Sequence, residues 1–172
     1  MIVLALDLST KNTGWSIFTD QSLTAHGYIN AGSTNVFRRI HHMVDEIKKI
    51  ITQYNPTKAI IEDVLPEDVK HNIQVYKALT YLQGFICDTL DTAKIEYAFY
   101  TASEWRKKCG IHTGRGIKRE SLKPKDIAFV QSQFGIKVND DEADAICIGF
   151  AAVGGKIKEP QVIVDEDGFE FA

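Results

Sequence analysis

The chain has 172 residues and a formal net charge of −3, with 44% apolar and 25% charged residues. Its length suits one domain with a substantial core, and its composition is that of an ordinary globular protein. No apolar run approaches the ~20 residues needed to cross a bilayer, and the N-terminus lacks the pattern of a secretory signal. We therefore expect a cytoplasmic protein with no membrane partner, whose three scattered cysteines are reduced.

The first third of the chain predicts three strands and a helix. The strand-like segments are 2–7, 13–20 and 22–30. The polar pair Asp20–Gln21 predicts a hairpin between the second and third. From Phe37 to Tyr54 apolar residues recur every three or four positions, which predicts an amphipathic helix. Asn55–Pro56 should end that helix.

The rest of the chain alternates helix-like and strand-like segments. Further strands are predicted at 58–63 and 95–101, and further helices at about 69–90, 102–108, 124–134 and 142–153. Strands that enter by helical crossovers lie parallel to a neighbour. We therefore predict an α/β fold, with a mixed five-stranded sheet flanked by helices, in one domain over residues 1–155. Residues 156–172 would form an acidic C-terminal extension.

Asp7 stands at the end of an apolar run, where an unpaired carboxylate costs several kcal/mol. A turn or cap, a buried salt bridge and a metal ligand would each explain it. Glu62 ends the fourth strand in the same way, and parallel pairing would bring both carboxylates to one edge of the sheet. Asp141 and Asp144 share one face at the start of the last helix. If that face meets the strand ends, four carboxylates converge.

Converging carboxylates repel one another unless a cation joins them. Sites made only of oxygen ligands favour Mg²⁺ or Mn²⁺ over zinc or copper. Two such ions about 4 Å apart can activate a water molecule and stabilise the departing oxygen of a phosphodiester. Each acid taken alone also has an ordinary explanation, as part of a turn, as an exposed strand end or as a helix-terminal acid. The three motifs together favour a metal site that hydrolyses phosphodiesters.

One segment is strongly basic although the whole chain is acidic. Residues 104–125 hold eight Lys or Arg and two Glu, whereas residues 159–172 hold five acidic residues and no basic one. A local basic patch can bind phosphate backbones, and a solvated charged loop is the alternative. The candidate DNA contacts are Arg106, Lys107, Lys108, Arg115, Lys118, Arg119, Lys123 and Lys125.

The acidic motifs resemble those of the RNase H-like superfamily, in its RuvC-type Holliday junction resolvase branch. The segments LALDLSTKNTGW, AIIED and DDEADAICIGFA place Asp7, Glu62, Asp141 and Asp144 on the four acidic positions of that family. The resemblance implies an RNase H-like fold and two Mg²⁺ ions held by these acids, with Mn²⁺ as a substitute. It also implies a homodimeric crossover junction endodeoxyribonuclease, a structure-selective enzyme of DNA recombination and repair. Family members also use a basic residue near the active site, and the best match here is WRKKCGI, with Lys107 or its neighbour Arg106.

The sequence departs from many relatives, for example in Leu8–Ser9 after the first acid, where they carry Pro–Gly, so the turn differs in detail. This compact, divergent form looks more like phage-encoded members of that family. A phage origin would place the protein in the host-cell cytoplasm and widen its substrates from four-way junctions to other branched DNA. Tyr76 and Tyr81 are candidates for stacking on bases, or else core residues. Two other functions stay open: an RNase H-like nuclease of RNA·DNA hybrid or structured RNA, and an inactive DNA-binding module.

Overall fold

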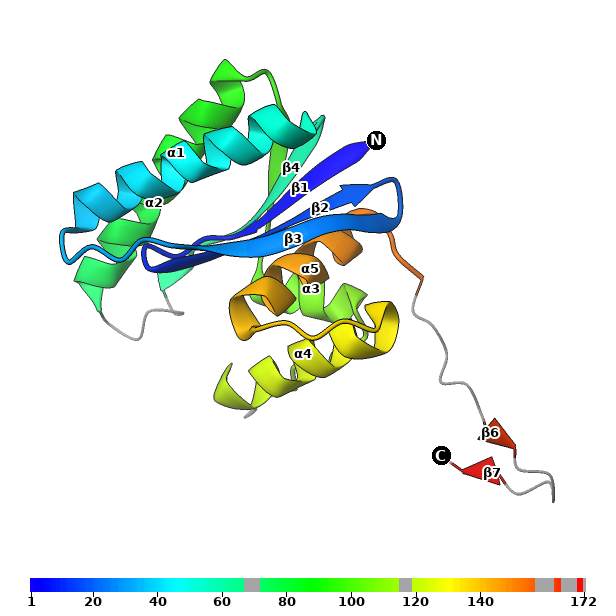
Figure 1. Ribbon diagram of the computed structural model, residues 1–172. Helices are drawn as coiled ribbons and strands as arrows, with labels where there is room; N and C mark the ends of the chain where they lie inside the picture. Colours follow the sequence, from blue (N-terminus) through cyan, green and yellow to red (C-terminus); the bar gives the residue numbers. More distant parts are fainter. Residues whose placement is uncertain (67–71, 115–118, 157–162, 165–169, 172) are drawn as a thin grey trace.

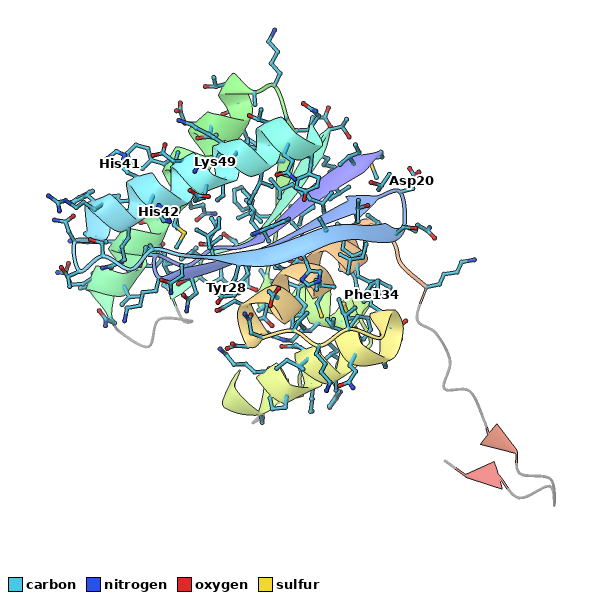
Figure 2. The ribbon with its side chains drawn as sticks, viewed as in Figure 1. Asp20, Tyr28, His41, His42, Lys49 and Phe134 are labelled. Carbon is cyan, nitrogen blue, oxygen red and sulfur yellow. The ribbon has the colours of Figure 1, made fainter. Side chains whose placement is uncertain are left out.

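A computed structural model describes residues 1–66, 72–114 and 119–156 and two short strands at 163–164 and 170–171. Within these ranges the main sheet has five strands in the spatial order β3-β2-β1-β4-β5 (Figure 1). The strands are β1 (Ile2–Asp7), β2 (Asn12–Thr19), β3 (Ser22–Asn30), β4 (Lys58–Glu62) and β5 (Glu96–Tyr100). The first three are antiparallel, whereas β1, β4 and β5 run parallel. The predicted mixed sheet is confirmed, with its hairpin turn at Asp20 (Figure 2).

In the described part of the chain, five helices cover the two faces of this sheet (Figure 1). They are α1 (Val36–Tyr54), α2 (Ile73–Thr92), α3 (Ala102–Lys108), α4 (Arg119–Phe134) and α5 (Asp140–Ala152). α1 and α2 lie on one face, and α3, α4 and α5 lie on the other. The short strands β6 (Ile163–Val164) and β7 (Glu170–Phe171) pair with each other. Among the described residues, no helix is long and apolar enough to cross a membrane.

Side chains alternate along β1 and thereby supply a core to each face of the sheet. Leu4 and Leu6 belong to the core beneath α1 and α2. Val3 and Ala5 belong to the second core, together with residues of α3, α4 and α5. Because strand residues two apart share a face, Asp7 is directed to the same face as Val3 and Ala5. The last residue of β1 therefore faces the layer that contains α5.

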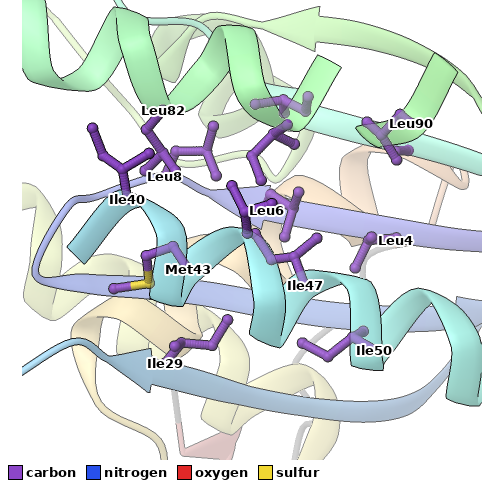
Figure 3. Close-up of a cluster of buried hydrophobic side chains, with 14 of the residues drawn as sticks. Leu4, Leu6, Leu8, Ile29, Ile40, Met43, Ile47, Ile50, Leu82 and Leu90 are labelled. Atoms are coloured by element: carbon purple, nitrogen blue, oxygen red, sulfur yellow. The ribbon is translucent and has the colours of Figure 1, made fainter. Parts of the chain in front are cut away.

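The first core fixes α1 and α2 on the sheet. Ile40 and Ile47 of α1 meet Leu6 of β1 and Leu82 of α2 in this cluster (Figure 3). All four side chains are fully buried, and burial of each is worth roughly 1.5–3 kcal/mol. Both helices are thereby packed against β1.

Two helices begin earlier than the sequence pattern predicts. α4 begins at Arg119 and contains Pro124 within it, so the predicted start near Pro124 is wrong. A proline close to the helix start removes one backbone hydrogen bond, and the remaining residues continue the helix. α5 begins at Asp140, because Asn139 and Glu142 form a reciprocal capping box. This start brings the acidic motif into the first turns of the helix.

Candidate active site

Two of the predicted acids lie side by side at the C-terminal edge of the sheet. Asp7 and Glu62 are the last residues of β1 and β4, and the parallel register of these strands pairs Leu6 with Ile61. Ile60 belongs to the core that contains α5, so Glu62 is directed to that face as Asp7 is. The topology therefore presents both carboxylates to the same helical layer.

A cavity of about 850 Å³ opens at this edge. Asp7, Asp141 and Asp144 line it on one side, and residues from the N-terminal parts of α1 and α2 line it on the other. Glu62 is not part of this lining, but it lies close enough to Asp144 for its charge to act on that carboxyl group. The structure thus brings three of the four acids to one cavity and places Glu62 near Asp144.

Close contacts between α5 and the sheet set the position of the acids. A Cβ atom built on Gly14 of β2 would lie 1.9 Å from the backbone oxygen of Asp141, so only glycine permits this approach. Glu142 Oε1 lies 2.9 Å from Nδ1 of His26 in β3. These contacts hold the first turns of α5 against β2 and β3.

Helix α3 contacts two of the acids through consecutive residues. Trp105 donates a hydrogen bond from Nε1 to Oε2 of Glu62 at 2.8 Å. Arg106 donates three hydrogen bonds of 2.8–3.2 Å to Asp126 of α4, and its Nη2 lies 3.8 Å from Oδ1 of Asp144. The side chains of Arg106 and Asp126 are 5% and 0% exposed. The prediction that Arg106 binds DNA is therefore wrong, because its guanidinium is buried and paired with a carboxylate.

Asp144 has the most strongly perturbed surroundings of the four acids. It is 4% exposed, and its Oδ1 accepts no hydrogen bond from the described residues. Burial raises the pKa of Asp144 well above its ordinary range; the charges of Asp7, Asp126 and Glu62 raise it further, and Arg106 opposes this. A nearby cation would stabilise the ionised form of such a group.

The acids in the first turn of α5 have different partners. Burial raises the pKa of Asp141, and the charge of Asp140 adds to this increase. Asp140 contacts Nζ of Lys123 in α4, and this contact lowers the pKa of Asp140. Lys123 also lines the acidic cavity. Among the described side chains, Lys123 is the only predicted DNA contact that does so.

The other predicted basic residues lie elsewhere. Lys107 lines a separate cavity of about 500 Å³ with Glu104 and His112, and its catalytic role stays a prediction. Lys107, Lys108 and Lys125 are exposed, as a phosphate contact requires. Three further candidates fall outside the described side chains: Arg115, Lys118 and Arg119.

The acids have the donor chemistry that Mg²⁺ prefers. All four are carboxylates, and a buried oxygen of Asp144 accepts no hydrogen bond from the described residues, so a hard cation would find suitable ligands. In the ranges that the structure describes, no three His, Cys, Asp or Glu side chains lie close enough to hold one ion. The residues therefore fit Mg²⁺ by their chemistry, although the described side chains do not form a complete set of ligands around one point.

Two solved Holliday junction resolvases are similar in structure to this chain. T. thermophilus RuvC in complex with Holliday junction substrate matches with a TM-score of 0.73 and 11% identity, over 90% of this chain and 94% of that one. Fowlpox virus resolvase, solved with Holliday junction DNA, matches with a TM-score of 0.60 and 15% identity, over 89% and 97%. The chain thus has the RNase H-like fold of the RuvC-type resolvases, as predicted.

Sequence comparison finds RuvC relatives and one matching family model. The crossover junction endodeoxyribonuclease RuvC of Francisella philomiragia is 28% identical over 154 residues, 86% of this chain and 85% of the relative. That of Rickettsia prowazekii is 24% identical over 162 residues, 91% and 99% of the two chains. The model of the family DUF3882, described as Lactococcus phage M3 protein, matches residues 1–152. The chain belongs to this family, whose description supports the predicted phage origin.

Proposed function

We propose that the protein is a metal-dependent endonuclease that hydrolyses phosphodiesters in branched DNA, with four-way junctions as its main substrate. One observation carries the proposal: Asp7, Asp141 and Asp144 line one cavity at the strand ends, with Glu62 beside Asp144. The similar proteins support the choice of substrate, because they are named crossover junction endodeoxyribonucleases or were solved with Holliday junction DNA.

The four acids would hold two Mg²⁺ ions, for which Mn²⁺ would substitute. Bound there, the ions would supply an activated water and stabilise the departing oxygen of the phosphodiester. The protein itself contributes positive charge both at the cavity and at positions farther from it. Lys123 in the cavity wall would hold a phosphate beside the acids, and the exposed Lys107, Lys108 and Lys125 would bind the DNA backbone farther away.

We also propose that the enzyme is a homodimer, since a four-way junction is resolved by nicks in two strands. Exposed aromatic side chains of α1 and α2, two of which (Phe37 and Tyr81) also line the acidic cavity, would form the interface. Phe37 stacks on Tyr81 with ring centroids 6.1 Å apart, and His41 packs on Phe85 at 5.9 Å; Figure 2 labels His41 on α1. Phe37, Tyr81 and Phe85 are 53%, 50% and 43% exposed. Light scattering should give a dimer mass for the wild type and a monomer mass for Phe85→Glu.

Cleavage of labelled nucleic acids in Mg²⁺ or EDTA tests the proposed function. The set comprises a four-way junction, a fork, a linear duplex, an RNA·DNA hybrid and a structured RNA. We expect paired, Mg²⁺-dependent nicks in the junction and little cleavage of the duplex. Preferential cleavage of the hybrid or of the RNA would support the alternative RNase H-like activity. Tight junction binding without cleavage in any substrate would support an inactive DNA-binding module.

A further inference from the structure

The proposed function employs the acids but gives no role to the residues that α3 directs toward them. Trp105 and Arg106 are 0% and 4% exposed. They stack on each other, with Cζ of Arg106 4.0 Å from the centroid of the Trp105 ring. A buried indole N–H requires an acceptor, and a buried guanidinium requires an anion. Trp105 pairs with Glu62, and Arg106 pairs with Asp126 of α4 and lies beside Asp144.

The partner of Trp105 is one of the predicted metal ligands. Its Nε1 donates to Oε2 of Glu62 at 2.8 Å. A carboxylate offers about four lone-pair sites on its two oxygens, and the Trp105 N–H occupies one of them. The indole is fixed by burial in the core of α3, α4 and α5. It can therefore hold the orientation of Glu62.

Arg106 lies between two buried carboxylates: it hydrogen-bonds to one of them and only approaches the other. It makes all three of its described side-chain hydrogen bonds to Asp126. Toward Asp144 it keeps a distance of 3.8 Å, and Oδ1 of Asp144 accepts no hydrogen bond from the described residues. The guanidinium therefore offsets part of the negative charge at Asp144 without binding the oxygen that a cation would use. Asp126 restrains it in this position.

We propose that Trp105 and Arg106 are positioning residues of the acidic site: Trp105 orients Glu62, and Arg106, held by Asp126, places its positive charge beside Asp144 without a hydrogen bond to Oδ1 of that residue. The inference rests on the proposed function, because it assigns these residues to the proposed Mg²⁺ site. Partners that orient metal ligands typically alter metal affinity or activity 10–100-fold when they are replaced. The experiment therefore measures metal binding directly and separately from cleavage.

Trp105→Phe tests the first half of the proposal, because it keeps a buried aromatic ring and removes the N–H donor. Trp15→Phe is the matched control, since Trp15 packs against Tyr54 at a centroid distance of 6.0 Å. Calorimetric titration with Mg²⁺ should show affinity about 10–100-fold weaker for Trp105→Phe and unchanged for the control. Circular dichroism verifies that both variants are folded. Wild-type affinity in folded Trp105→Phe would overturn the proposal.

The control variant supplies a second readout. The chain has two tryptophans, so Trp15→Phe leaves Trp105 as the only one, beside Glu62. Mg²⁺ should change its fluorescence, and Glu62→Gln in the same background should abolish the change. A Mg²⁺ response without junction cleavage by the wild type would support the positioning role and count against the proposed function. Junction cleavage without any Mg²⁺ response of Trp105 would overturn the positioning role alone.

Asp126→Asn tests the second half of the proposal. Without the charge of Asp126, the guanidinium of Arg106 should turn toward Asp144 and compete with Mg²⁺ for its oxygens. We expect Mg²⁺ affinity to fall about 10–100-fold, measured at low temperature on protein with a native circular dichroism spectrum. Wild-type affinity in this folded variant would overturn the role assigned to Arg106.

Discussion

The buried pair of Arg106 and Asp126 predicts a large loss of stability when one partner is removed. Asp126→Asn keeps the size of the side chain and removes the charge that pairs with the guanidinium, which is 5% exposed. Breaking a buried ion pair in this way costs about 3–5 kcal/mol. Since Asp144 lies 3.8 Å from Arg106 and offsets part of its charge, we expect a loss of about 3 kcal/mol. For a chain of this length that corresponds to a decrease in Tm of roughly 6–12 °C.

Thermal unfolding in EDTA at pH 7, followed by circular dichroism, measures this change, and urea unfolding gives the free energy. Asp45→Asn is the matched control, because it makes the same replacement at an exposed position of α1. We expect the control to change the free energy of unfolding by less than about 0.5 kcal/mol. A Tm for Asp126→Asn within about 2 °C of the wild type would refute the reasoning, because it would correspond to less than about 1 kcal/mol.

Three further predictions concern the site. Gly14→Ala should lower the free energy of unfolding by about 1–3 kcal/mol and reduce cleavage, because α5 must move. Gly84→Ala, with open space around its Cβ on α2, should instead stabilise the protein by roughly 0.5–1 kcal/mol. Equal Tm values for the two variants would contradict this prediction. Asp144→Asn should raise Tm in EDTA at pH 7. Because the pKa of Asp144 is raised in the folded state, its ionisation destabilises the fold as pH rises above about 4. The Tm difference between Asp144→Asn and the wild type should therefore widen between pH 4 and pH 8. A constant Tm difference would argue against a raised pKa. Junction affinity, measured by gel shift, should fall steeply between 50 and 200 mM salt through counterion release. Lys123→Ala should reduce the slope of log affinity against log salt concentration by about one. An unchanged slope would show that Lys123 does not contact the DNA.

The sequence predicted most of the fold because its periodicity is strong. The alternation over 13–30 is confirmed as β2 and β3, and the three-and-four spacing from Phe37 is confirmed as α1. The short helix 102–108 is α3 in the structure, with the same bounds. The start of α4 was the main error, since a proline signals a helix start only when the residues before it do not already form a turn.

The acids could be located from sequence because each ends a strand or begins a helix, and the order of elements then brings those ends together. Their buried partners could not be located in this way. Arg106 stands in a basic segment and resembles a surface residue until the packing of α4 against α3 and α5 is known. Asp126 did offer a signal: it shares the helical spacing of Leu122, Phe129 and Val130, all of them buried. An acid on such an apolar face requires a cationic partner.

Cleavage of a labelled four-way junction by the wild type and Asp7→Asn, in Mg²⁺ and in EDTA, tests the central claim most directly. We predict paired nicks by the wild type that require Mg²⁺ and disappear in Asp7→Asn. Junction binding by the variant, measured by gel shift, should persist, because the substitution removes a predicted metal ligand and leaves the basic surface unchanged. Full cleavage activity in Asp7→Asn would contradict the assignment of the acidic cavity as the active site.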